Sequence, residues 1–203
     1  MAVAQVSRAR ITLQGSAEMV SEFFHIAINS ILFVRGLYGY TKFDTISKYG
    51  LQVRVTNDED LKCYLQQVVA QLNNWLLAKT IKKVVFVIQE AVSDETIERW
   101  EFDIECDKDM NTESRAKVKP IEEIQKEIRV FMRQVLGSVH LLPALENKCK
   151  FDIQVHVGSE AEFDGEWKDS SDKKISTPTI LHLNSFSTLV HTVKPHVAYK
   201  SHD

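Results

Sequence analysis

The sequence KPIEEIQKEIRVFMRQVLGSVHLL, residues 119–142, predicts one long helix on which the other elements pack. Pro120 suits the first helical position because its missing N–H would have no partner there, and Glu122 and Glu123 complement the helix dipole. Pro143 ends the helix. Apolar residues recur at spacings of three and four, which predicts a buried stripe of Ile121, Ile124, Ile128, Met132, Val135, Val139 and Leu142.

The opposite side of this helix is mixed in character. Arg129, Arg133 and Gln134 are polar, as a solvated face requires. Phe131 and Leu136 widen the apolar stripe beyond what contact with one sheet face needs. The helix is therefore expected to have a second surface with a purpose of its own.

Composition indicates an ordinary soluble globular protein. The 203 residues suit one domain, and the chain is 44% hydrophobic and 26% charged. A formal charge of -3 argues against binding to nucleic acid or an anionic membrane, and no run approaches the length needed to cross a bilayer. Three dispersed cysteines, Cys63, Cys106 and Cys149, favour a reducing compartment, the cytosol or nucleus.

The N-terminal part predicts an apolar helix. Residues 11–15 read as an extended lead-in, and Ser16 is a plausible N-cap for a helix running to about Val34. Arg35 complements the dipole at its end, and Gly36 can supply a left-handed C-cap. Because apolar residues occupy nearly every side, this helix is expected to be covered on most of its surface.

A second helix is predicted after a hairpin and a short strand. Residues 37–47 are consistent with a hairpin around Gly39, and residues 51–55 alternate as a strand does. Thr56 and Glu59 form a capping-box pattern for a helix ending near Lys79. Its expected buried stripe is Leu61, Leu65, Val68, Leu72 and Leu76.

Alternating or continuous apolar residues predict a sheet. The expected strands are residues 81–89, buried on both faces, then 97–106, 149–157, 180–190 and 193–200. Residues 107–118 and 158–178 are expected to be loops. The pattern predicts an α+β domain with three helices on one face of a mainly antiparallel sheet.

No local motif of catalysis or nucleotide binding is present, so we expect no enzyme activity and no cofactor or metal. Three groups could resemble catalytic or metal sites but are expected to have ordinary structural roles. They are Asp103 with Glu105 as a solvated strand face, His182, His191 and His196 as surface or hydrogen-bonded side chains, and Cys106 with Cys149 as core thiols. Trp75 fits either core packing or a binding groove. The long loop around Trp167 fits either an insertion or a functional loop.

Several strings together resemble the HORMA-domain family, and the last four are specific to its branch in the spindle assembly checkpoint. They are Ile11-Thr12-Leu13 running into Gly15-Ser16-Ala17-Glu18, Glu22-Phe23-Phe24, Ile28-Asn29-Ser30-Ile31-Leu32, Lys48-Tyr49-Gly50-Leu51, Glu98-Arg99-Trp100, Phe102-Asp103-Ile104-Glu105-Cys106-Asp107 and Val197-Ala198-Tyr199-Lys200. The resemblance covers essentially the whole chain. Gly39, where relatives usually have proline, and Leu141, where phenylalanine is common, depart from the family pattern.

The resemblance implies a single HORMA domain over residues 1–203, with an N-terminal segment at 1–15, a core at 16–157 and a mobile C-terminal safety belt at 158–203. In the family the belt pairs with one sheet edge in an open state. In the closed state it crosses to the other edge and wraps a linear peptide laid beside the strand at residues 149–157.

The resemblance also implies two sites. The expected peptide-binding residues are Trp75, Phe151, Ile153, Val155 and Tyr199. The expected interface between an open and a closed copy consists of Arg35, Arg133, Gln134 and Leu141.

The implied function is a checkpoint switch that captures a peptide motif and so inhibits the anaphase-promoting complex until chromosomes are attached. Implied partners are a kinetochore coiled-coil adaptor, the activator of that complex, a checkpoint kinase of the inhibitory complex, a HORMA-like silencing protein, an AAA+ remodelling ATPase and a second copy of the chain. Nucleus and cytoplasm, with kinetochores and spindle in mitosis, are the implied locations. The alternatives are a HORMA adaptor in translesion DNA synthesis or meiotic chromosome axes, and a small hydrolase that uses Asp103 or the C-terminal histidines.

Overall fold

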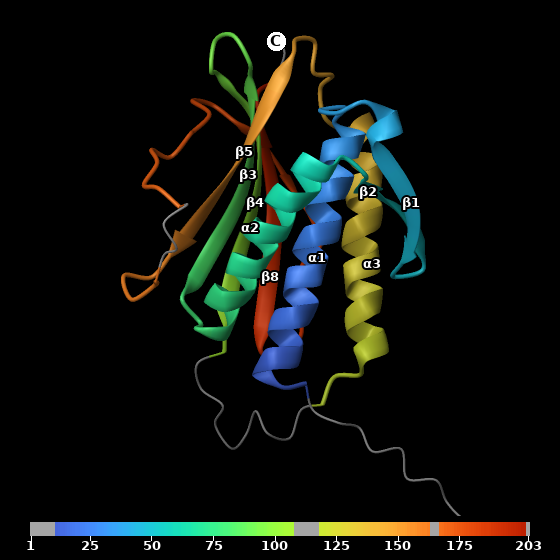
Figure 1. The fold of residues 1–203 in the computed structure, drawn as a ribbon, viewed down its shortest axis with the longest axis vertical. Coiled ribbons are helices and arrows are strands. Elements are labelled where there is room, and N and C mark those ends of the chain that lie inside the picture. The colour runs from blue at the N-terminus through green and yellow to red at the C-terminus, as the bar shows by residue number, and fades with distance from the viewer. Residues whose placement is uncertain (1–10, 108–117, 163–166, 202–203) are drawn as a thin grey trace, which may run out of the picture.

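The computed structural model describes residues 11–107, 118–162 and 167–201. Three helices, α1 (Leu13–Val34), α2 (Glu59–Leu77) and α3 (Ile121–Gly137), lie on one face of a mainly antiparallel sheet, as predicted (Figure 1). Most of the predicted loop at 107–118 and of the N-terminal segment lies outside the described residues.

The N-caps of α1 and α2 differ from the prediction. Thr12, rather than Ser16, caps α1, because its Oγ1 accepts a hydrogen bond from the Gly15 N–H at 3.0 Å. Asp58, rather than Thr56, caps α2 by accepting from the Leu61 N–H at 3.2 Å. Gly36 follows α1 with φ of 65°, which confirms the left-handed position expected there.

The central helix α3 is shorter than predicted. It begins after Pro120, which is the N-cap residue, and ends at Gly137, where a short 3-10 helix (Ser138–His140) continues the chain. Two members of the predicted stripe are exposed, Ile121 at 48% and Val139 at 44%. The remaining members of the stripe are buried, as predicted: Ile124, Ile128, Met132, Val135 and Leu142.

The main sheet has six strands, whose bounds are β3 (Ile81–Glu90), β4 (Thr96–Cys106), β5 (Cys149–Val157), β6 (Thr179–His182), β7 (Phe186–Ser187) and β8 (His191–Tyr199). The strand order is β5-β3-β4-β8-β6, with β7 also paired to β8. The predicted strand at 180–190 is therefore two short strands, both hydrogen-bonded to β8. Val84 to Ile88 are fully buried, which confirms a strand covered on both faces.

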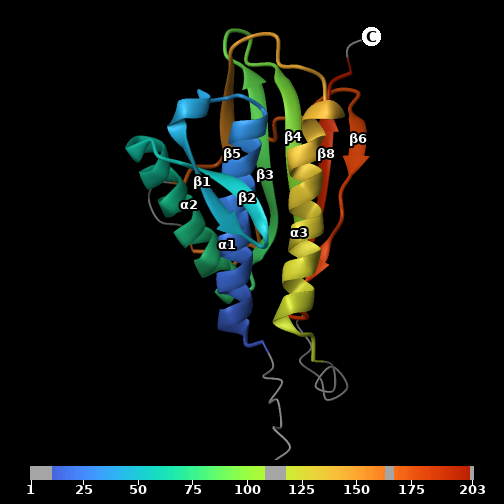
Figure 2. The same cartoon turned by 90° about the vertical axis from the view of Figure 1, so that its right-hand side faces the viewer.

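A separate hairpin is formed by β1 (Phe43–Lys48) and β2 (Leu51–Thr56). Its turn lies at Tyr49 and Gly50, so the prediction of a turn at Gly39 is wrong. Gly50 has φ of 68°, and a Cβ there would lie 3.0 Å from the Arg129 side chain of α3. Figure 2 shows this hairpin packed on the helices away from the sheet.

The core explains the wide apolar side of α3. Phe131 is fully buried, and its ring lies 5.1 Å from Phe23 and 6.0 Å from Phe102 in edge-to-face contacts. Phe186 of β7 completes the cluster at 4.6 Å from Phe23. The expectation that Phe131 belongs to a second surface is therefore wrong, because α3 packs against both α1 and the C-terminal strands.

Helix α1 is long and apolar enough, by length and composition only, to cross a membrane. The prediction that no segment approaches this length is therefore wrong by that test. The helix is also a core element here, because 67% of its apolar window is buried within the fold.

Candidate functional site

Strand β5 is one edge of the main sheet. It pairs with β3 on its inner side, and no strand pairs with its outer edge within the described residues. Phe151 stacks on Phe86 with ring centroids 5.2 Å apart, and Ile153 is 6% exposed. These side chains face the helices, so the strand presents backbone groups at its free edge without exposing a broad apolar face.

Helix α2 borders this edge with aromatic side chains. The Tyr64 ring lies 6.0 Å from that of Phe151, and Trp75, near the end of the helix, is 2% exposed. Trp75 Nε1 donates to the Glu162 carbonyl oxygen at 2.9 Å, and its ring contacts Trp167 at 4.9 Å. The long loop is therefore packed on α2 through its tryptophan.

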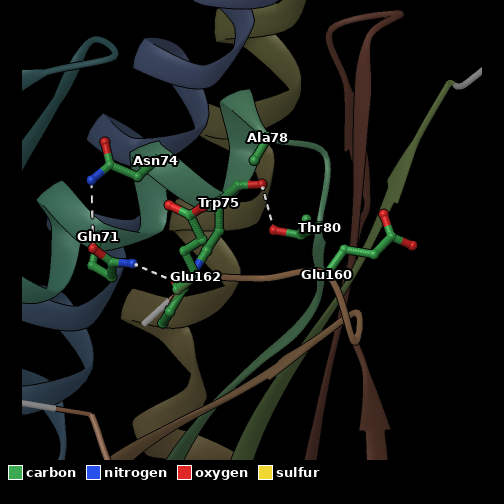
Figure 3. Close-up of a pocket in the computed structure, with 7 residues that line it drawn as sticks. All are labelled: Gln71, Asn74, Trp75, Ala78, Thr80, Glu160 and Glu162. Carbon is green, nitrogen blue, oxygen red and sulfur yellow. Dashed lines mark hydrogen bonds between the residues drawn. The ribbon is translucent and has the colours of Figure 1, made fainter. Parts of the chain in front are cut away.

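Three cavities surround the Trp75–Trp167 contact. One of about 620 Å³ is lined by Gln71, Asn74, Trp75, Ala78, Thr80, Glu160 and Glu162 (Figure 3). A second of about 370 Å³ runs along residues 153–159 of β5 and residues 167–172 of the loop. A third of about 390 Å³ lies between α2, Ile153 and the same loop. Strand β5 thus lines two of these neighbouring cavities, whose other wall includes residues 167–172 of the loop, and the three cavities together are called the channel.

The described chain beyond residue 167 leads from the β5 edge to the opposite edge of the sheet. Residues 167–178 leave the β5 edge, and the following strands join the sheet beyond β4 (Figure 1). Strand β8 pairs with β4 along its whole length, from Glu98 opposite Tyr199 to Cys106 opposite His191. The segment beside the β5 edge therefore leads into strands that pair at the other edge of the sheet, beyond β4.

A family model named HORMA domain matches residues 16–191. The chain belongs to the HORMA-domain family. It is 43% identical over 197 residues to the "Mitotic spindle assembly checkpoint protein MAD2A" of Homo sapiens, covering 97% of this chain and 96% of the relative. It is 42% identical over 200 residues to the protein of the same name in Dictyostelium discoideum, covering 98% of both. The chain is therefore a HORMA-domain protein of the MAD2 family.

The fold of this HORMA domain agrees with a solved relative. A chain in a structure named "Crystal Structure of Mitotic Checkpoint Complex" superposes with a TM-score of 0.83 at 38% identity, covering 92% of this chain and 99% of that one. The element order and the sheet are thus those of the family.

Four of the five predicted peptide-binding residues lie together in the HORMA domain. Trp75, Phe151, Ile153 and Val155 are on α2 and β5, and each borders the channel or packs beside it. Tyr199 does not join them. It pairs with Glu98 on β4 and Thr179 on β6, so β3 and β4 separate it from β5.

The four residues predicted to form a self-interface are also divided. Arg133 is exposed, Leu141 is 63% exposed, and Gln134 Oε1 accepts from the Asn184 N–H at 2.7 Å. Arg35 is 7% exposed, and its guanidinium lies 2.9 Å from Glu98 and donates to the Pro143 carbonyl. Because the Arg35 side chain is buried in this conformation, it is not available to a self-interface here, and its part in one stays a prediction.

Glu98 is the ion-pair partner of the buried Arg35 side chain. Burial raises the pKa of the Glu98 carboxyl, while the Arg35 guanidinium and the Trp100 indole N–H oppose that rise. The pair joins the end of α1 to the middle of the sheet. A buried charge of this kind requires its partner.

The groups weighed for catalysis have structural partners. Asp103 lies 3.2 Å from Lys83, and Glu105 lies 2.6 Å from Lys194. His196 lies 3.7 Å from Glu101 and its ring is 6.1 Å from His182, while His191 is buried in hydrogen bonds. The described residues contain no group of three or more His, Cys, Asp or Glu suited to a metal, and Cys106 and Cys149 are half-buried rather than fully in the core.

Sequence reasoning missed the polar residues under the loop. Arg99 on β4 and Gln154 on β5 are 4% and 7% exposed and bind loop residues, although strand alternation places them on the face expected to meet solvent. The sequence feature that could have indicated their burial is the length of the loop, because a loop of this length in a compact domain is expected to pack on other residues.

Proposed function

We propose that this chain is a spindle assembly checkpoint switch that captures a linear peptide of a partner protein and so inhibits the anaphase-promoting complex. The observation that carries the proposal is the free outer edge of β5, facing a channel enclosed by residues 167–172. The names of its relatives support the cellular role.

The mechanism is addition of a peptide strand to β5. Main-chain hydrogen bonds to the free edge fix the peptide, and pockets between α2 and the loop read its side chains. Each such bond contributes about 1 kcal/mol net, so a short strand alone binds modestly. Enclosure by the loop acts mainly on the dissociation rate, because the loop must move before the peptide can leave.

The position of β8 corresponds to the closed state of the switch. Its pairing with β4 leaves the β5 edge accessible, whereas the proposed open state places the C-terminal segment on that edge and competes with the peptide. Residues 158–203 form the moving belt. Exchange must break the β4–β8 ladder and expose Val193 and Val197, so it is slow.

The proposed partners are the kinetochore coiled-coil adaptor and the activator of the anaphase-promoting complex, which supply the peptides, together with the checkpoint kinase of the inhibitory complex. A HORMA-like silencing protein and an AAA+ ATPase reverse the closed state, and open and closed copies dimerise through α3. These roles place the protein in the nucleus and cytoplasm, and on kinetochores and the spindle in mitosis.

Peptide capture tests the proposal directly. The purified chain is incubated with a peptide from the adaptor or from the activator, and with a scrambled peptide of the same composition. Size exclusion follows the complex, and NMR follows shifts of the β5 amides. We expect capture of the two native peptides only. No complex after days of incubation, with either peptide, would reject the proposal.

Deletion of residues 189–203 would not test peptide locking alone. It removes β8, an internal strand whose Val193 and Val197 are fully buried, and so destabilises the sheet as well as the belt. Substitutions within the loop test whether the loop retains the peptide and do not remove a strand from the sheet.

A further inference from the structure

Residues 170–173 cross the outer face of the sheet, the face away from the helices. Asp152 and Gln154, which alternate with the helix-facing Phe151 and Ile153, point to this side of β5. The segment is bound there by side chains of the sheet and forms no strand of its own. Its attachment therefore depends on a small set of polar contacts.

Arg99 of β4 makes the strongest of these contacts. Its Nη1 donates to Asp172 Oδ1 at 2.6 Å and to the Lys173 carbonyl oxygen, and its Nε donates to Glu101 at 2.9 Å. The Arg99 side chain is 5% exposed. Because a buried guanidinium needs its hydrogen-bond partners, release of the segment leaves Arg99 with fewer acceptors.

Two further side chains hold the neighbouring residues. Gln154 Nε2 donates to Ser170 Oγ at 2.9 Å and to the Ser171 carbonyl at 3.0 Å. Lys173 Nζ donates to Gln89 Oε1 at 2.8 Å and Asp152 Oδ2 at 3.0 Å. Residues of β5, β3 and β4 thus hold four consecutive loop residues.

The electrostatics of Asp172 match this role. Burial alone raises the pKa of its carboxyl, but Arg99 and the Lys174 charge outweigh burial and hold the pKa below its ordinary value. Asp172 is therefore ionised at neutral pH, and its bond to Arg99 is charge-assisted on both sides.

We propose that Arg99 and Asp172, with Gln154 and Lys173 beside them, act as a buckle that fastens residues 170–173 across the sheet and sets the rate at which the peptide channel opens. This inference rests on the proposed function for its consequence, although the buckle itself is fastened in the chain without a peptide. Arg99 and Asp172 are positioning residues: Asp172 is at the end of the loop wall of the cavity beside β5, and neither residue is on the β5 strand that receives the peptide.

The buckle has a kinetic signature. We take the buckle to be fastened in the closed chain both without peptide, as here, and with it, so weakening the buckle lowers the barrier to opening in both directions. Association and dissociation rates of the peptide rise together, on the order of tenfold for loss of one charge-assisted contact, and Kd changes little. A residue that contacts the peptide changes mainly the dissociation rate.

Asp172→Asn is the test variant, because the side chain is on a loop, is 33% exposed and keeps its shape. Glu146→Gln is the matched control: it removes the same charge from an exposed loop position that lines neither of the cavities beside β5, and Glu146 forms no ion pair among the described residues. Lys173→Met and Lys148→Met form a second matched pair, since Lys148 is exposed and forms no ion pair among the described residues, whereas Lys174 lies 3.5 Å from Asp172 and is unsuitable as a control.

Two measurements decide the proposal. Stopped-flow binding of a labelled adaptor peptide gives both rates, and hydrogen exchange of amides 170–174 reports the buckle in the protein without peptide. We expect Asp172→Asn and Lys173→Met to raise both rates and the exchange, and the two controls to match the wild type. Exchange and rates equal to those of the controls would overturn the buckle. Failure of the wild type to bind peptide would reject the proposed function. Hydrogen exchange of amides 170–174 would still test the buckle, because it needs no peptide.

Discussion

His191 Nδ1 lies 2.7 Å from the hydroxyl oxygen of Ser16, which joins the start of β8 to the first turn of α1. The Ser16 hydroxyl is also 2.6 Å from that of Thr188, and His191 Nε2 lies 3.3 Å from the Leu76 carbonyl of α2. Ser16 and His191 are fully buried. The two helices therefore hold β8 beside β4 through one buried polar cluster.

Ser16→Ala is expected to destabilise the fold by about 1–3 kcal/mol, because it leaves the buried His191 and Thr188 groups short of a partner. Chemical denaturation measures the change in the free energy of unfolding. Ser47→Ala, on the exposed side of β1, is the control and should stay within about 0.5 kcal/mol of the wild type. Equal stabilities of the two variants would show that the cluster adds nothing.

Mild acid is expected to weaken the same cluster. Burial lowers the pKa of His191 from its ordinary 6.5, the bond to the Leu76 carbonyl opposes this, and the Lys79 charge lowers the pKa further. The unfolded chain then binds the proton more tightly, so the stability from neutral His191 is complete above about pH 6.5 and is lost as pH falls below it.

The measurement is the free energy of unfolding at about pH 7.5 and pH 5.5 for wild type, His191→Gln and His140→Gln. His191→Gln should lose less stability on acidification than wild type, because it has no proton to gain at this position. The exposed His140 variant should follow the wild type. Parallel slopes for all three proteins would contradict the assignment.

Arg35→Met is expected to cost about 3–5 kcal/mol, because it leaves the buried Glu98 carboxylate without its ion pair. Arg35→Met with Glu98→Gln should be more stable than Arg35→Met alone, since glutamine carries no charge. Lys42→Met, in an ion pair whose lysine is 53% exposed, is the control and should destabilise the fold far less than Arg35→Met, because solvent screens an exposed pair. If thermal unfolding shows that Arg35→Met is as stable as Lys42→Met, Arg35 would have to be treated as an exposed residue.

The sequence predicted the elements of this fold better than their ends. Periodicity identified α2 and the fully covered β3, because burial requires apolar residues at fixed spacings. Ser16 was a reasonable N-cap by residue type, but its hydroxyl is engaged by His191, a residue 175 positions away. Local chemistry cannot show which of two capping residues has a distant partner.

The residues that the family resemblance implies for peptide binding are only partly brought together by the fold, and their role stays a prediction. Trp75, Ile153 and Phe151 come together because α2 packs on β5, while Tyr199 is displaced by the order of strands in the sheet, which no local pattern specifies. Arg99 reads as solvent-facing by alternation alone. Its burial depends on a loop more than seventy positions later in the chain.

Arg133→Glu is expected to abolish self-association without changing stability, because Arg133 is an exposed residue of α3 and forms no ion pair among the described residues. Light scattering measures the dimer, and chemical denaturation measures the fold. A double variant with Gln134→Ala is less informative, since Gln134 accepts the Asn184 N–H at 2.7 Å and its loss disturbs the C-terminal segment as well. Lys126→Glu reverses the same charge at another exposed position of α3 and should leave the dimer intact. A dimer that survives Arg133→Glu, or that is lost in both variants, would place the interface away from Arg133.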